Sequence, residues 1–264
     1  MNRIEAQRRW PVRIAAIYDI HGNLPALDAA LREIDRENPD LIVVGGDIAS
    51  GPLPRATLER LMGLGGRARF IRGNADRELV ACFDGDPLDP SLPDASQEET
   101  RWAAGQLERA HRDFLAQLPE HAIVAADSLG DVLFCHGSPR SDEEILTVAT
   151  PDGRAGAALA GVAQRVVVCG HTHMQFDRYV GAVRVVNAGS VGMPYGEPGA
   201  YWASFGPEVM LHHTPYDLDR AAELIRGSGD PQAHEFATHN VLAPPTAAEA
   251  IATFEHMAAQ RSRP

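Results

Sequence analysis

Residues 14–24 read Ile-Ala-Ala-Ile-Tyr-Asp-Ile-His-Gly-Asn-Leu, and residues 41–47 read Leu-Ile-Val-Val-Gly-Gly-Asp. Each stretch is a short apolar run, typical of a buried strand, followed by glycine and by side chains that can bind a metal. The apolar residues of segment 24–37, which joins them, recur with helical period. This strand–helix–strand alternation predicts βαβ units and a mostly parallel sheet.

The rest of the chain continues this pattern and then changes to hairpins. In the first half we predict strands at 12–18, 41–44 and 69–71, helices at 24–37, 54–64 and 97–118, and an acidic, proline-rich loop at 84–96 that is a lid or an insertion. In the second half we predict hairpins of 122–126 with 131–135, 175–180 with 183–187 and 201–205 with 209–213, a strand at 165–169, and helices at 142–162, 217–226 and 246–260. We therefore expect an α/β fold in which two sheets pack face to face with helices outside.

Composition narrows the class of protein. The chain has 264 residues, 44% of them hydrophobic, which is enough for a core and excludes disordered and fibrous classes. We expect one domain over residues 1–264, with a core at about 12–215 and a helical C-terminal extension at about 216–264. The net charge of −12 opposes stable nucleic-acid binding. The three cysteines form no C-x-x-C pair and no apolar run is long enough to span a membrane, so we expect a cytoplasmic protein; the oligomeric state stays open.

Residues that can bind a metal follow five of the predicted strands. Because ligands bind beyond the carboxyl ends of the strands in open α/β sheets, we expect these side chains to meet at one edge. They are Asp19, His21, Asp47, Asn74, His136, His171 and His173. Oxygen donors mixed with imidazoles suit Mn²⁺, Fe or Zn²⁺. Seven ligands are too many for one ion, so we predict two divalent ions roughly 3.5–4 Å apart.

The ordered set Asp19-Ile20-His21, Gly46-Asp47, Gly73-Asn74, His136 and Gly170-His171-Thr172-His173 resembles the calcineurin-like metallophosphoesterase superfamily. The run Asn187-Ala-Gly-Ser-Val-Gly192 is similar to its small bacterial phosphodiesterase branch. The resemblance covers about residues 12–215 and implies an αββα sandwich of two mixed sheets. It also implies that one metal is held by Asp19, His21, Asp47 and His173, and the other by Asp47, Asn74, His136 and His171, with Asp47 bridging.

Two departures from the family pattern bear on the substrate. Enzymes of the superfamily that act on phosphoproteins or nucleotides usually carry a histidine directly after the Gly-Asn pair, where this chain has Ala75. The segment after Asp47 also lacks the arginine by which protein Ser/Thr phosphatases grip phosphate. A leaving group of low pKa needs less help from an acid, so we expect a phosphodiester or an activated phosphomonoester as the substrate.

The predicted reaction is in-line attack on phosphorus by a metal-bridging hydroxide, with Asp47 and Asn74 as catalytic residues. Asn74 and Arg140 are the candidates for binding the phosphate of a small substrate, including nucleotide-type ones, and Arg72 is a weaker candidate. The alternatives are a non-catalytic scaffold similar to the retromer subunit on the same fold, and a protein Ser/Thr phosphatase. We interpret Cys135 and Cys169 as buried apolar residues, and Ser138, Ser190, His212 and His213 as structural.

Overall fold

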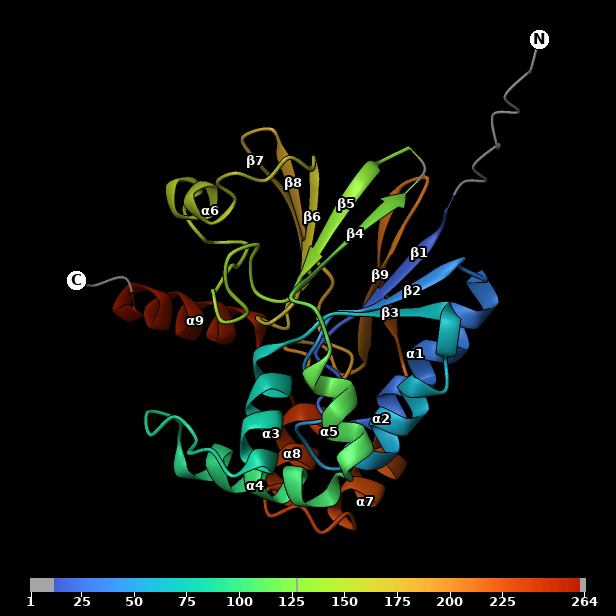
Figure 1. Cartoon of the computed structure of the whole chain (residues 1–264), viewed down its shortest axis with the longest axis vertical. Helices are drawn as coiled ribbons and strands as arrows, with labels where there is room; N and C mark the ends of the chain where they lie inside the picture. Colours follow the sequence, from blue (N-terminus) through green and yellow to red (C-terminus); the bar gives the residue numbers. More distant parts are fainter. Residues whose placement is uncertain (1–11, 127, 262–264) are drawn as a thin grey trace.

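The computed structural model describes residues 12–126 and 128–261, and within these ranges two five-stranded sheets pack against each other (Figure 1). The first sheet has the order β10(Val209–Thr214), β9(Ala200–Phe205), β1(Ile14–Ile17), β2(Leu41–Val44), β3(Ala68–Phe70). The second has the order β4(His121–Ala126), β5(Gly130–Cys135), β6(Val166–Cys169), β8(Val183–Asn187), β7(Phe176–Val180). The pairs β1–β2, β2–β3, β5–β6 and β6–β8 are parallel, and the pairs β1–β9, β9–β10, β4–β5 and β7–β8 are antiparallel.

The two-residue period of strand β1 supplies two separate layers of the core. Ile14, Ala16 and Tyr18 belong to the apolar cluster between the two sheets. Ala15 and Ile17 point the other way, into the cluster beneath the helices. Because both faces of the strand are buried, its sequence is a continuous apolar run instead of an alternating one.

Helices cover the outer face of each sheet, which confirms the predicted α/β sandwich with two mixed sheets (Figure 1). The first sheet is covered by helices that include α1, which begins after its N-cap Asn23. On the second sheet, α6 packs against the outer cluster. The α-helices are α1(Leu24–Glu37), α2(Pro54–Met62), α3(Asn74–Asp84), α4(Asp94–Gln106), α5(Arg109–Ala116), α6(Asp152–Ala158), α7(Leu218–Arg226), α8(Ala233–Phe236) and α9(Ala247–Arg261), with a 3₁₀ turn at Gly65–Arg67 and a π-helical turn at Ala237–Leu242.

Some predicted elements need correction. Helix α3 begins at Asn74, where no helix was predicted. The helix expected at 97–118 is two helices, α4 and α5, because the backbone of Leu107 is extended and Glu108 starts a new helix with a capping box. Only Asp152–Ala158 of the segment 142–162 is α-helical. The ends of the expected domain, 1–11 and 262–264, lie outside the described residues. No described helix has both the length and the apolar character that a membrane span requires.

Phe134 and Phe205 join the two sheets at their interface. Phe134 lies on β5 and Phe205 on β9, and their rings meet edge to face with centroids 5.7 Å apart. Both side chains are fully buried. The contact therefore contributes to the association of one sheet with the other.

We expect Phe134→Ala to lower the free energy of unfolding by about 3–5 kcal/mol, because it leaves a cavity between the sheets. Urea denaturation followed by circular dichroism measures this change. Ile123→Ala on the neighbouring strand β4 is the control, since that side chain is 50% exposed, and its cost should stay below about 1 kcal/mol. Equal losses in the two variants would contradict the assignment of Phe134 to the intersheet core.

Candidate metal centre

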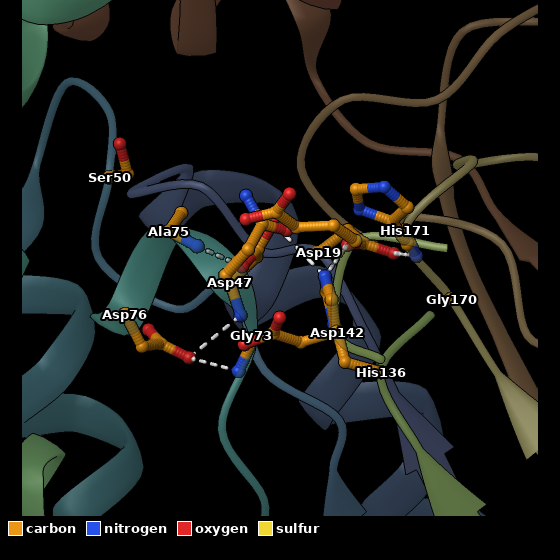
Figure 2. A network of polar contacts seen from close by, with 12 residues as sticks. Asp19, Asp47, Ser50, Gly73, Ala75, Asp76, His136, Asp142, Gly170 and His171 are labelled. Atoms are coloured by element: carbon orange, nitrogen blue, oxygen red, sulfur yellow. Dashed lines mark hydrogen bonds and ion pairs between the residues drawn. The ribbon is translucent and has the colours of Figure 1, made fainter. Parts of the chain in front are cut away.

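The predicted metal-binding side chains converge at one edge of the two sheets. The side-chain donor atoms of Asp19, His21 and His173 lie within 4.8 Å of one another, and so do those of Asp47, His136 and His171. Asp47 connects the two groups: its Oδ2 is 3.2 Å from His136 Nε2 and 3.6 Å from His21 Nε2. Asn74 adjoins Asp47, because the backbone N–H of the next residue, Ala75, donates to Asp47 Oδ1 at 2.9 Å (Figure 2).

The backbone is left-handed at five of these residues. Among the described non-glycine residues, positive φ occurs at Asp19, His21, Asp47, His171, His173 and one helix C-cap, Asn38. This conformation costs free energy in an L-residue and persists only where the surrounding structure enforces it. Its concentration at the convergent side chains makes this edge the candidate functional site.

Hydrogen bonds fix the orientation of three of the imidazoles. The Nδ1 atoms of His21, His136 and His173 lie 3.2, 2.8 and 2.8 Å from the backbone carbonyls of Ser50, Gly45 and Met193. A carbonyl can only accept, so each Nδ1 carries hydrogen and donates it. Each Nε2 is then the atom turned toward the site, which is the arrangement that metal-ligating histidines adopt.

When the imidazoles are neutral, the inner atoms of the site are all acceptors. The Nε2 atoms of His21 and His173 face each other at 3.3 Å. Among the described residues, Asp19 Oδ1, Asn74 Oδ1 and His136 Nε2 are buried without a hydrogen-bond partner. Buried acceptors are rarely left unsatisfied, and a cation satisfies several of them at once. The donor set thus fits divalent metal ions.

The pKa values of the buried groups also indicate that the site favours positive charge beside its two carboxylates. Burial opposes ionisation of Asp19 and Asp47, but the neighbouring imidazoles outweigh it and lower the pKa of both carboxyls. Burial also opposes protonation of His136, yet the carboxylate of Asp47 and then that of Asp19 raise its pKa to about 10. Burial and the charge of His136 lower the pKa of His171 to about 4. Without a metal, protons on some of the imidazoles balance the two carboxylates.

Asp76 supports the site and was not among the predicted site residues. Its carboxylate is buried and accepts from the backbone N–H groups of Asp47, Ile48 and Gly73, each at 2.9 Å (Figure 2). It therefore ties the loop after β2 to the start of α3. Burial and the charge of Asp47 raise the pKa of Asp76 to about 7, against the effect of the backbone donors.

Glycine is required where these two loops meet. A Cβ on Gly73 would lie 2.1 Å from Asp47 Oδ1, and one on Gly46, whose φ is +94°, would lie 2.3 Å from the Gly73 nitrogen. Both distances are far below van der Waals contact. The glycines in the Gly46-Asp47 and Gly73-Asn74 pairs thus allow the close approach that places Asn74 beside Asp47.

Arg140 lies beside the site but is already paired. Its guanidinium donates to Glu144 Oε2 at 2.8 Å and to the carbonyl of Ala157 at 3.1 Å. Together with His136 and Ser138 it lines a cavity of about 160 Å³. Arg72 donates to Glu120 at 2.8 Å. Binding of phosphate by either arginine stays a prediction.

The residues interpreted as structural have structural contacts. Cys135 and Cys169 are free, fully buried and packed in the outer core of the second sheet, which confirms that interpretation. The Ser190 hydroxyl donates to the backbone oxygen of Asp19 at 2.7 Å, so it supports the loop after β1. His212 stacks on Trp202 with ring centroids 3.8 Å apart.

Comparisons with known proteins agree with this geometry. A family model described as the calcineurin-like phosphoesterase superfamily domain matches residues 12–205. The chain belongs to this superfamily. It is similar to the crystal structure of a metallophosphoesterase from Sphaerobacter thermophilus, with a TM-score of 0.69 and 27% identity over 87% of this chain and 98% of that one.

One solved structure and one curated protein give two further matches. A hypothetical protein from Pyrococcus horikoshii OT3 shares the fold, with a TM-score of 0.75 and 22% identity over 89% of this chain and 100% of that one. A symmetrical bis(5'-nucleosyl)-tetraphosphatase from Janthinobacterium sp. (strain Marseille) is 39% identical over 72 residues. That match spans only 26% of each chain, about a quarter of the curated relative's length.

We expect Asp76→Asn to destabilise the protein by about 1–3 kcal/mol, because an amide nitrogen would replace a carboxylate oxygen that faces backbone N–H groups. Urea unfolding of the metal-free protein measures the loss. The control is Asp86→Asn, at an exposed position in the loop after α3, and it should leave the midpoint unchanged. An unaltered midpoint in Asp76→Asn would contradict the supporting role of this residue.

We also expect metal binding to release protons. A ligating imidazole must be unprotonated, whereas the raised pKa of His136 keeps it protonated in the metal-free protein at neutral pH. Affinity for Mn²⁺ should therefore rise with pH between about 6 and 9. Isothermal titration calorimetry in buffers of different ionisation enthalpy counts the protons released, and a binding heat independent of the buffer would contradict this prediction.

Proposed function

We propose that this protein is a dinuclear metal-dependent phosphoesterase that hydrolyses phosphodiester bonds or activated phosphomonoesters. The observation that carries the proposal is the convergence of carboxylate, amide and imidazole donor atoms in two buried groups, with the Nε2 atoms of His21 and His173 facing each other and Asp19 Oδ1 and Asn74 Oδ1 left without a hydrogen-bond partner among the described residues. Membership in the phosphoesterase superfamily supplies the reaction class.

The two groups of side chains correspond to two ions. Asp19, His21, Asp47 and His173 would hold one, and Asp47, Asn74, His136 and His171 the other. Asp47 is proposed as the shared ligand because its Oδ2 lies near imidazoles of both groups. Bound divalent ions lower the pKa of water to about 7 and neutralise phosphoryl oxygens. We propose Mn²⁺, Fe or Zn²⁺, since mixed oxygen and imidazole donors suit these ions.

Asn74 is the proposed contact between the protein and the phosphoryl group. Its Oδ1 is free to ligate, and its amide nitrogen makes only a long hydrogen bond, 3.5 Å, to Glu78. That nitrogen can turn to donate to a phosphoryl oxygen. Arg140 would have to exchange its contact with Glu144 for the substrate.

The position of Ala75 favours substrates with a good leaving group. Ala75 uses its backbone N–H to hold Asp47 and has no side chain that could donate a proton to a departing oxygen. Phosphodiesters with a leaving group of low pKa, phosphoanhydrides and aryl esters can be hydrolysed with less help from an acid, because the departing oxygen needs no proton to leave. The curated relative is a symmetrical bis(5'-nucleosyl)-tetraphosphatase, so we propose nucleotide-type substrates within this class. Action in the cytoplasm remains part of the proposal, consistent with the free cysteines.

A scaffold without metal is the less favoured alternative. Such a protein would gain nothing from left-handed backbone at five polar residues or from buried acceptors without partners. A protein Ser/Thr phosphatase is also less favoured, since the segment Ile48-Ala49-Ser50-Gly51 offers no arginine for phosphate.

We expect Asp47→Asn to lower kcat/KM by about 100-fold or more, because it weakens the ligand shared by both ions. The assay uses Mn²⁺-loaded protein with bis-aryl phosphate, aryl monophosphate and a dinucleoside tetraphosphate, and metal analysis of each sample. Asp28→Asn, which removes a surface partner of Arg60, is the matched control and should keep full activity.

Three outcomes would contradict the proposal at different levels. No hydrolysis of any substrate by the metal-loaded protein would exclude the phosphoesterase function. Faster turnover of an alkyl monophosphate, whose leaving group has a high pKa, than of the aryl substrates would exclude the substrate preference. Turnover of phosphopeptides above that of diesters would favour a protein phosphatase.

A further inference from the structure

We propose that the C-terminal helix α9 positions His173 through Tyr195 and Phe254, and that one of the two metal positions depends on this helix. This inference rests on the proposed function, because it takes His173 as a metal ligand. Helix α9 lies beyond residue 205, where the match to the family domain ends. It is therefore an addition to the family core that acts on the core's own site.

Two ring contacts connect the helix to the imidazole. The ring of Tyr195 stacks on that of His173, with centroids 5.9 Å apart and an interplanar angle of 26°. Phe254, on α9, meets Tyr195 edge to face at 6.0 Å and 77°. Tyr195 thus lies between Phe254 on the helix and His173, a predicted metal ligand.

Polar contacts hold α9 in this place. Glu255, next to Phe254, accepts hydrogen bonds from the hydroxyls of Thr147 at 2.6 Å and Thr150 at 2.7 Å, and forms an ion pair with Arg154. Figure 1 shows α9 passing beside the segment between β5 and α6 that contains these threonines. The helix is thus fixed to the second sheet's loops at the turn from which Phe254 projects.

The loop that carries Tyr195 is fastened at both sides. The backbone N–H of Gly196 donates to the carbonyl of Pro245, just before α9, at 2.9 Å. On the other side, the Met193 carbonyl accepts from His173 Nδ1, and the Met193 N–H donates to the Ser190 hydroxyl at 2.7 Å. The loop 193–196 therefore lies between the metal site and the entry to the helix.

The other group of ligands has its support inside the family core. His136 donates to the carbonyl of Gly45, and its ring packs against that of His171 with centroids 5.2 Å apart. Asp47 is held by the backbone of Ala75, and its loop is held by Asp76. All of these residues lie within 12–205, so this metal position is built without α9.

The consequence is an asymmetry between the two metal positions. Without the ring of Tyr195, the imidazole of His173 keeps its hydrogen bond to Met193 but loses the ring stacked on its face, so changes in its side-chain torsions move Nε2 more readily. Outer contacts of metal ligands typically contribute 10–100-fold in metal affinity. Loss of the contacts with α9 should therefore weaken the binding of one ion and leave the binding of the other unchanged.

The test is a titration of the metal-free full-length chain with Mn²⁺, by calorimetry and by electron paramagnetic resonance, which distinguishes a lone Mn²⁺ from a spin-coupled pair. We expect Tyr195→Ala and Phe254→Ala to lower the affinity for one of two ions about 10-fold or more and to shift the spectrum toward a lone ion. Tyr195→Phe should restore wild-type binding, because the ring makes the contact. Glu255→Ala should act in the same direction, since it loosens the helix without removing a ring.

Met257→Ala is the matched control, because Met257 lies on the same helix with its side chain 37% exposed. It should bind both ions as the wild type does. Unchanged affinities in Tyr195→Ala and Phe254→Ala, or equal weakening of both ions, would overturn the inference while leaving the proposed function intact. A wild-type chain that binds no Mn²⁺ would instead overturn the proposed function itself.

Discussion

The structure depends on one electrostatic constraint, which is that two buried carboxylates and the imidazoles around them need positive charge among them, from protons or from metal ions. Two carboxylates, an amide oxygen and four imidazoles meet where the sheets end, and several of their inner atoms have no partner among the described residues. Such a cluster is costly unless positive charge enters it. The left-handed backbone that brings these groups together costs further free energy. Binding of divalent ions, as proposed, would return part of that free energy.

The parts of the molecule that the sequence predicts are those with strong local signals. The apolar runs of β1 and β2 and the periodic segment of α1 indicated their own structure, and the polar residues that follow the strands could be placed at one edge because parallel strands end together. The helix predicted over 142–162 was wrong in its first part, because that part is held by tertiary contacts such as those of Thr147 and Thr150 with Glu255 on α9. Local periodicity carries no information about a partner that lies so far along the chain.

Residues that support the site without being predicted metal ligands were the hardest to predict. Asp76 was visible only as the fourth residue of a Gly-Asn-Ala-Asp run, and its function depends on N–H groups whose positions require the fold. Its place at the third position of a helix, where acidic residues often accept from free N–H groups, was a usable signal. Tyr195 offered no such signal, because nothing in its neighbourhood reveals that its ring covers His173.

The pairing of β1 has a consequence for how the chain is made. This strand is synthesised long before one of its neighbours, β9, because Ile14 lies opposite Phe205 in the sheet. Until β9 has been synthesised, one hydrogen-bonding edge of an entirely apolar strand stays open. Exposed edges of this kind pair readily with other chains. Nascent copies of this protein are therefore open to association through β1 until β9 is in place.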